Sequence, residues 1–232
     1  MGEEEMAVVR SLTVAETVGA TRERNTTLLS WGKDGIQTFS FSENVLQVSA
    51  KGHHFALLTA NGKVYTWGRQ KKDAPVLGLG PTVREVRSPT LVQSLQGHFM
   101  IKIACGLVTS GAIDIRNRAY LWGDTFGAQS QIAFFPEEFR ALRGRRVLQL
   151  ALSHKHGLAL VQSGATHEDT QVWSWGFAVD GMLGHPNFSN TYEPQDPCSI
   201  HELDDENVVH VDTSDTHCCV CTTRGELWAW GK

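Results

Sequence analysis

The chain has 232 residues, of which 41% are hydrophobic and 20% are charged, and its formal net charge is −4 at pH 7. A chain of this length can bury a sizeable core as one domain. The acidic balance argues against direct nucleic-acid binding, because phosphates are bound by clustered Lys and Arg. No apolar run approaches the ~20 residues of a membrane span, so we expect no membrane partner.

Residues 1–26 form an acidic, poorly patterned leader that begins Met-Gly-Glu-Glu-Glu-Met. No positively charged start is followed by an apolar stretch, so the leader does not resemble a secretory signal. Met6 stands where a myristoylation signal requires Ser or Thr. The five cysteines, an odd number, then favour a reducing compartment. We therefore expect an intracellular protein, either cytoplasmic or nuclear.

From residue 27 to residue 232 the sequence repeats. The dipeptide Trp-Gly occurs at Trp31-Gly32, Trp67-Gly68, Trp122-Gly123, Trp175-Gly176 and Trp230-Gly231. Subtracting successive Trp numbers gives steps of 36, 55, 53 and 55 residues. A nearly constant period of this kind identifies a repeat architecture. Residues 27–232 are thus predicted to be a domain whose units end near these glycines.

Each full unit contains three predicted strands. In the first unit these strands are residues 45–48, 55–59 and 64–67, and a Gly-containing turn joins the second to the third. An aromatic residue stands two positions before each repeating Trp of the full units: Tyr65, Tyr120, Trp173 and Trp228. Side chains two residues apart on a strand share one face. The sequence therefore predicts small antiparallel sheets with one aromatic face, and an all-β fold.

One polar position recurs immediately before the second strand of each unit, occupied by His54, Thr109, His156 and His217. A catalytic residue is placed once, whereas a residue that returns every ~53 positions usually holds a turn by bonding backbone groups. We assign these four residues a structural role. The four repeating tryptophans Trp67, Trp122, Trp175 and Trp230 are expected at equivalent, buried positions.

The same turns also carry residues that we expect to face solvent. His53, His154 and Asp215 lie in the turns of three units and are predicted to line one rim of the molecule. They form our candidate interaction site.

The cluster of Cys218, Cys219 and Cys221 near His210 and His217 suggests a metal site. The repeat register favours packing instead, because Cys219 and Cys221 align with apolar strand residues of the other units. Free Cys is a small, often buried hydrophobe, and no second Cys-x-x-Cys pair exists to complete a zinc site. We find no nucleophile elbow or phosphate loop either. The sequence predicts no catalytic residue, metal or cofactor, and hence no enzyme.

The pattern of Val-x-x-Val, a turn with His, an Ala-Leu strand, Gly-x-Val-Tyr-x-Trp-Gly and then Gly-x-Leu-Gly resembles the regulator of chromosome condensation repeat family. Residues 48–68 and 172–185 carry it best, and the resemblance covers residues 27–232. It implies a β-propeller, in this family usually of seven four-stranded blades. The chain holds about four units, so we expect an incomplete, open ring.

The chain departs from the family pattern at two places. The family's glycine before the turn survives as Gly106, and Lys51, Ser153 and Ser214 replace it elsewhere. The Gly-x-Leu-Gly turn is clear at residues 181–184. The resemblance therefore implies a divergent, truncated member of the family.

The resemblance implies two functional classes. The first is a non-catalytic protein-interaction scaffold, which we favour. The alternative is guanine-nucleotide exchange on, or regulation of, a small GTPase. A remote third reading is a tryptophan-based photoreceptor, as in the related plant ultraviolet-B receptor, although the corresponding turns here contain no Trp. An open ring would expose sheet edges, so we also expect self-association of the isolated chain and no intrinsic exchange activity.

Overall fold

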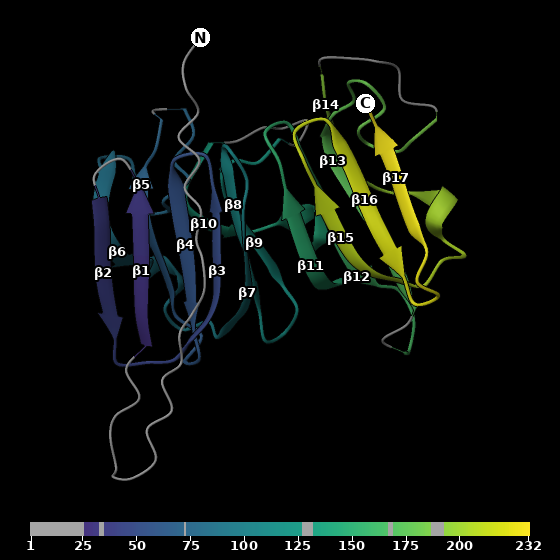
Figure 1. Ribbon diagram of the computed structural model, residues 1–232. Coiled ribbons are helices and arrows are strands. Elements are labelled where there is room, and N and C mark those ends of the chain that lie inside the picture. Colours follow the sequence, from purple (N-terminus) through teal and green to yellow (C-terminus); the bar gives the residue numbers. More distant parts are fainter. Residues whose placement is uncertain (1–25, 33–34, 72, 127–131, 167–168, 187–192) are drawn as a thin grey trace.

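The computed structural model describes residues 26–32, 35–71, 73–126, 132–166, 169–186 and 193–232. These residues form 17 strands in five antiparallel sheets, together with three single-turn 3-10 helices. The sheets follow one another around an arc (Figure 1). The predicted all-β class and propeller arrangement are confirmed. All of the expected leader except Thr26 lies outside the described residues. Among those residues, no helix has the length and apolarity required to cross a membrane.

Three sheets are complete four-stranded blades in which each strand pairs with the next one along the chain. Blade 1 consists of β3 (Val45–Lys51), β4 (His54–Thr59), β5 (Val64–Arg69) and β6 (Glu85–Leu91). Blade 2 consists of β7 (Met100–Cys105), β8 (Thr109–Asp114), β9 (Ala119–Asp124) and β10 (Ile132–Glu138). Blade 3 consists of β11 (Arg146–Leu152), β12 (His156–Gln162), β13 (Thr170–Phe177) and β14 (Pro194–Ser199).

The two end sheets are incomplete within the described residues. The half-blade pairs β1 (Thr26–Gly32) with β2 (Gly35–Phe41). Because β1 ends in Trp31-Gly32, it corresponds to the third strand of a blade. Blade 4 has three strands: β15 (Val208–Thr213), β16 (His217–Thr222) and β17 (Leu227–Gly231). The helices η1 (Gln93–Leu95), η2 (Arg140–Leu142) and η3 (His201–Leu203) lead into blades 2, 3 and 4.

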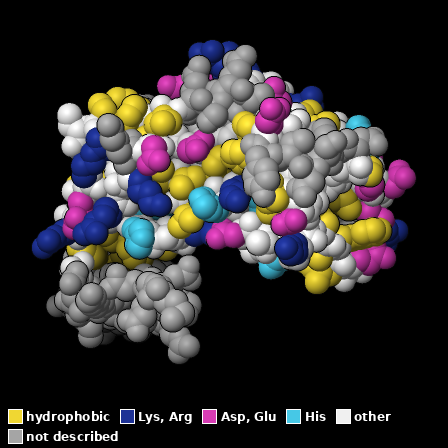
Figure 2. Space-filling model, turned by 90° about the horizontal axis from the view of Figure 1, so that it is seen from above, with side chains coloured by type: hydrophobic (Ala, Val, Ile, Leu, Met, Phe, Trp, Pro, Cys, Tyr) yellow, Lys and Arg dark blue, Asp and Glu magenta, His cyan; other side chains and the backbone are white. Residues whose placement is uncertain are grey.

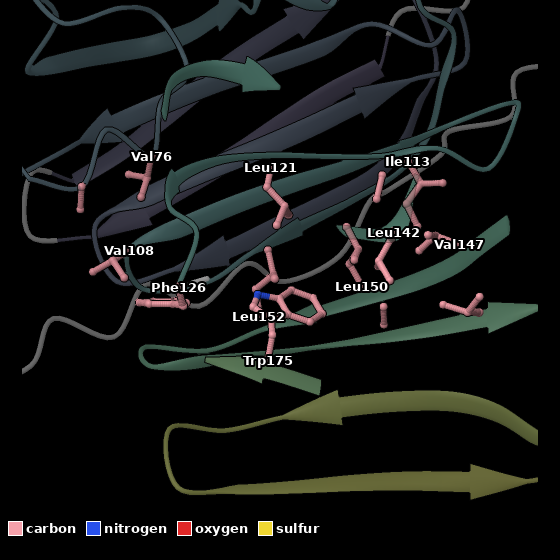
Figure 3. Close-up of a cluster of buried hydrophobic side chains, with 14 residues drawn as sticks. Val76, Val108, Ile113, Leu121, Phe126, Leu142, Val147, Leu150, Leu152 and Trp175 are labelled. Atoms are coloured by element: carbon pink, nitrogen blue, oxygen red, sulfur yellow. The ribbon is translucent and has the colours of Figure 1, made fainter. Parts of the chain in front are cut away.

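The core lies between neighbouring blades rather than at one centre. Both faces of a complete blade are covered, which explains why the second strands are apolar runs instead of alternating patterns. In blade 1, for example, Ala56 and Leu58 pack towards blade 2, while Leu57 packs towards the half-blade. Figure 3 shows the cluster between blades 2 and 3, in which Leu121 faces Trp175.

The Trp-Gly pair has a structural explanation. The glycine has a φ of +109° at Gly68, +93° at Gly123, +109° at Gly176 and +106° at Gly231. A Cβ atom at Gly176 would lie 2.4 Å from the carbonyl oxygen of Lys155, in the turn that opens the second strand. Any larger residue would collide with that backbone, so each third strand can approach its turn only through glycine.

The first strand of each of blades 1 to 4 contains a β-bulge near its start. The register shifts between Val45 and Gln47, Met100 and Lys102, Val147 and Gln149, and Val208 and His210. A bulge bends its strand and re-aims the neighbouring side chains. Here it leaves Leu46, Ile101 and Val209 exposed towards the hollow of the arc. These inner strands line a cavity of about 440 Å³.

Blade 4 departs from our expectation of equivalent burial. Trp67, Trp122 and Trp175 are at most 3% exposed, whereas Trp230 is half-buried. The reason is structural: β17 has no fourth strand beside it in the described part of the chain. The four tryptophans nevertheless hold the same register, each one residue before the Gly that pairs with the His or Thr of the turn.

Candidate functional site

In blades 3 and 4 a serine side chain holds the turn between the first and second strands. In blade 3 the Ser153 hydroxyl lies 2.9 Å from Nδ1 of His156 and accepts hydrogen bonds from the backbone N–H groups of Lys155 and His156. In blade 4 the Ser214 hydroxyl lies 2.9 Å from Nδ1 of His217 in the same way. The serines that replace the family glycine therefore orient the histidine rings.

The buried histidines also join neighbouring blades. His54 Nε2 lies 2.8 Å from the Ser110 hydroxyl of blade 2, and that hydroxyl donates to the carbonyl of Val76 in the blade 1 loop. His156 Nε2 lies 3.1 Å from the Cys218 thiol of blade 4, which lies 3.4 Å from the carbonyl of Met182. We call each of these contacts a histidine bridge.

The repeating tryptophan completes each histidine bridge from the other side. The indole N–H of Trp122 donates to the Val76 carbonyl at 2.7 Å, and that of Trp230 donates to the Met182 carbonyl at 3.0 Å. Val76 and Met182 occupy equivalent places, because each is followed by a Leu whose carbonyl accepts a hydrogen bond from a hydroxyl on the third strand of the same blade, Thr66 or Ser174. The sequence stretch ending in Leu77-Gly78 is therefore a second copy of the loop that was clear only at residues 181–184.

Burial makes the bridging histidines poor acid–base groups. Desolvation lowers the pKa of His54 and of His156 from 6.5 to about 4. Both rings are therefore neutral near pH 7, and neither side chain is exposed by more than 1%. Groups with these properties suit packing between blades rather than proton transfer to a bound substrate.

A second contact between blades involves the bulged inner strands. The Gln47 amide donates to the Ile103 carbonyl at 2.8 Å and accepts from the Ile103 backbone N–H at 2.9 Å. Gln149 makes the same pair of bonds with Val211, at 2.7 and 3.3 Å. At the equivalent place in blade 2, the Lys102 ammonium donates to the Leu148 carbonyl at 2.6 Å.

The predicted rim residues lie in these turns but do not all hold one register position. Counting back from the histidine or threonine, His154 and Asp215 are equivalent, whereas Gly52 rather than His53 takes that position in blade 1. His53 and Asp215 are exposed, and His154 is half-buried. Figure 2 shows this end of the molecule, where histidine, basic and acidic side chains lie close together near the middle.

One residue that our sequence reasoning did not select connects this rim across the arc. The Lys51 ammonium lies 3.5 Å from the Asp215 carboxylate and 3.5 Å from the Leu152 carbonyl. It therefore spans blades 1, 3 and 4, although Lys51 and Asp215 are distant in sequence. The presence of Lys51 in place of the family glycine is visible in the sequence and marks this position as unusual. The repeat pattern does not indicate that its partner is Asp215.

Thr109 and His217 differ from the two bridging histidines. Thr109 is buried and donates through its hydroxyl to the Asp124 carbonyl, so it stabilises its own blade instead of forming a histidine bridge. Across from it, blade 3 has Gly157 at the position that Ser110 takes in blade 2 and Cys218 takes in blade 4. His217, the fourth member of this set, is exposed, whereas His54 and His156 are buried.

The five cysteines are free thiols. Cys218 is buried against blade 3, and Cys219 and Cys221, which are half-buried, alternate to the opposite face of β16. Among the described residues, no group of three or more His, Cys, Asp or Glu side chains could hold a metal ion.

Comparison with known protein families gives matches to one family of repeats. The model described as "Regulator of chromosome condensation (RCC1) repeat" matches residues 61–113 and 169–221, and a second model with the same description matches residues 45–72. These ranges together span more than half of the chain.

Two curated relatives show the same sequence identity to this chain. The E3 ubiquitin-protein ligase HERC2 of Homo sapiens is 29% identical over 197 residues, which cover 82% of this chain and 4% of HERC2. The ultraviolet-B receptor UVR8 of Arabidopsis thaliana is 29% identical over 194 residues, covering 81% of this chain and 41% of the receptor. The chain thus spans less than half the length of either relative.

Among solved structures, Prp20p from Saccharomyces cerevisiae superposes with a TM-score of 0.66 at 21% identity. The match covers 81% of this chain and 44% of Prp20p, a protein whose structure was described with its binding properties to Gsp1p and histones. This likeness concerns the fold.

Proposed function

Because the chain belongs to the regulator of chromosome condensation (RCC1) repeat family, we propose that it acts as a non-catalytic protein-interaction module. The binding surface on this proposal is the rim that contains His53, His154 and Asp215. The supporting observation is that neighbouring residues of the turns have different environments. The bridging histidines His54 and His156 are buried in contacts between blades, whereas the rim residues beside them are at least partly exposed to solvent.

The chemistry of the rim favours a protein partner. His53 and His154 can each donate or accept hydrogen bonds, and Asp215 supplies an acceptor next to the Lys51 ammonium. Such a mixed surface matches the polar rim of a typical protein interface better than the uniformly basic surface required by phosphates. The neutral, buried histidines support the non-catalytic part of the proposal.

A triple variant tests the rim. His53→Ala, His154→Ala and Asp215→Ala together should reduce partner recovery by proximity labelling or pull-down at least about tenfold, since interface energy is concentrated in few residues. The matched control changes Asn61, Arg116 and Arg224 to Ala, three exposed residues in turns that join the second and third strands. Unchanged recovery with the rim variant would contradict the proposal.

A direct assay separates binding from nucleotide exchange. On our proposal, the purified chain does not accelerate release of a fluorescent guanine nucleotide from small GTPases. Acceleration that depends on chain concentration and is abolished by the rim variant would establish exchange as the activity and overturn the scaffold assignment.

A further inference from the structure

The hollow of the arc is lined mainly by the first strands of blades 1 to 4. At the bulge of each strand an apolar residue is followed by a polar one: Leu46-Gln47, Ile101-Lys102, Leu148-Gln149 and Val209-His210. All of these residues except Leu148 line the cavity of about 440 Å³. Pockets for small ligands usually have volumes of about 300–1,000 Å³. The hollow is therefore large enough for a small molecule.

Three of the apolar bulge residues are accessible to solvent inside this cavity. Leu46 is 62% exposed, Val209 is 52% exposed and Ile101 is 36% exposed. Leu148 differs, because it packs against the core between blades 3 and 4. Burial of the three accessible side chains by a ligand would remove hydrocarbon surface from water, which is favourable. The cavity therefore favours a ligand with an apolar body.

The polar bulge residues differ in how much of their hydrogen-bonding capacity the fold uses. Gln47 and Gln149 each make a pair of hydrogen bonds with the backbone of the next blade. Lys102 takes the equivalent place in blade 2. In the part of the chain that the structure describes, its ammonium donates to the Leu148 carbonyl at 2.6 Å and to no other group. An ammonium has three N–H donors, so two of them are available to a ligand.

Lys102 also has no counter-ion among the described residues. No Asp or Glu is found among the described residues that line the cavity, and Lys102 is the one Lys or Arg there. Solvent reaches the side chain through the hollow, but partial burial of its ammonium lowers the pKa of Lys102 by desolvation. A cation that is partly removed from water normally has an anion beside it. The charge of the cavity therefore favours an anionic ligand.

We propose that the hollow binds a small amphipathic carboxylate. The carboxylate accepts hydrogen bonds from the Lys102 ammonium, and the apolar chain packs against Leu46, Ile101 and Val209. A single ammonium matches the charge of one carboxylate, whereas a phosphate is typically bound by several donors, such as an Arg fork or a helix N-terminus. The cavity is separate from the rim, so this inference goes beyond the proposed function and does not depend on it.

Calorimetric titration of the purified chain with decanoate tests the proposal. Decanoate is used at pH 7 and below its micelle concentration, and decanol and decylamine serve as probes with the same apolar chain but a neutral or cationic head. We expect one decanoate to bind per chain, at least about tenfold more tightly than decanol or decylamine, because hydrogen bonds between charged groups are stronger than those between neutral groups.

Substitutions at Lys102 test the role of its charge. Lys102→Met should weaken decanoate binding at least about tenfold and leave decanol binding unchanged, because it removes the ammonium but keeps a long apolar side chain. Lys102→Arg keeps the positive charge and should retain most of the affinity for decanoate. The matched control is Lys71→Met, since Lys71 is an exposed lysine that does not line the cavity, and it should bind decanoate like the parent chain.

A substitution at Leu46 tests the apolar part of the site. Leu46→Asn should weaken the binding of both decanoate and decanol, because each loses the same hydrocarbon contact. Ile115→Asn is the matched control: Ile115 is 63% exposed, close to the 62% of Leu46, but it follows β8 and does not line the cavity. Urea unfolding midpoints of all variants identify any change in binding that is due to a loss of folding.

Several results would overturn the inference. They are a lack of decanoate binding at about 1 mM, equal affinity for decanoate and decylamine, and full affinity in the folded Lys102→Met variant. Tighter binding of the peptide acetyl-Leu-Val-Leu than of decanoate would also overturn it, because the occupant would then be the C-terminus of another chain. The rim variant should bind decanoate like the parent chain, so failure of the proposed function and failure of this inference are distinguishable.

Discussion

At Gly176 the absence of a Cβ atom explains why glycine recurs after the tryptophan in each unit. Its φ of +109° is unfavourable for any residue with a side chain, and the missing Cβ also leaves room for the Lys155 carbonyl at 2.4 Å and for the His156 Cα at 2.7 Å. Gly97 has a similar φ of +92°, but nothing lies within 4 Å of its hypothetical Cβ. A substitution at Gly97 would therefore introduce backbone strain alone, whereas a substitution at Gly176 would introduce both backbone strain and a steric collision.

This contrast gives a stability prediction. Gly97→Ala should reduce the free energy of unfolding by roughly 1–3 kcal/mol, the cost of a strained backbone conformation. Gly176→Ala should cost several kcal/mol in addition, because the turn must move away from the third strand. Urea unfolding at pH 7 of both variants measures the difference. Equal losses would show that the turn yields without cost and that the collision is unimportant.

At the scale of the strand and turn, the buried histidines make the fold sensitive to acid. His54 and His156 have folded-state pKa values of about 4 because burial disfavours the charged ring, against 6.5 for an ordinary histidine. The unfolded chain therefore binds more protons than the folded chain between these values. Desolvation also lowers the pKa of His185, which acts in the same direction.

We accordingly expect stability to be complete above pH 6.5, to fall between pH 6.5 and 4, and to level off below pH 4 with respect to these groups. Each of the two bridging histidines contributes a loss of roughly 3 kcal/mol over that interval. Urea midpoints at pH 7, 6 and 5 would measure it. His156→Asn should flatten the curve, whereas His201→Asn, on an exposed side chain, should not. A flat wild-type curve would mean that water reaches the bridging rings.

The strands were predictable from the sequence because their signal is local. The Trp-Gly spacing located all four third strands, and the apolar runs located the second strands. The fourth strands were less clear, since β10 and β14 contain Pro and polar residues and lie at sheet edges, where a strong apolar pattern is unnecessary.

The candidate site was predictable in part. The recurrence of His54 and His156 predicted a structural role, but their partners Ser110 and Cys218 belong to the following blade and carry no local signal. Lys51 escaped notice for the same reason, since its contact with Asp215 depends on the curvature of the arc. The exposure of His217 could not be inferred from a pattern that gives every unit the same environment.

For the whole molecule, stability should vary along the arc. Repeat arrays gain stability mainly from contacts between neighbours, so a unit covered on one side is weaker than a unit covered on both. Blade 3 packs against blades 2 and 4, whereas blade 4 packs against blade 3 within the described residues. In the part of the chain that the structure describes, no strand pairs with the outer edge of β17.

Hydrogen exchange should reveal this gradient. We expect the paired amides of β16 and β17 to exchange at least about tenfold faster than those of β12 and β13, whose sequences and registers are similar. Uniform exchange across blades 3 and 4 would indicate that the arc unfolds as a single cooperative unit.

The pairing of every strand with its neighbour in sequence also bears on how the chain is made. Ribosomes add about 5–20 residues per second, so a repeat of ~53 residues emerges within roughly three to ten seconds. Each blade can close its hairpins in that time without waiting for distant segments, because hairpin formation takes microseconds. Until the next unit emerges, the newest blade presents an uncovered face like that of blade 4. Chaperones that recognise apolar β-surface would therefore meet the same surface once per repeat during synthesis.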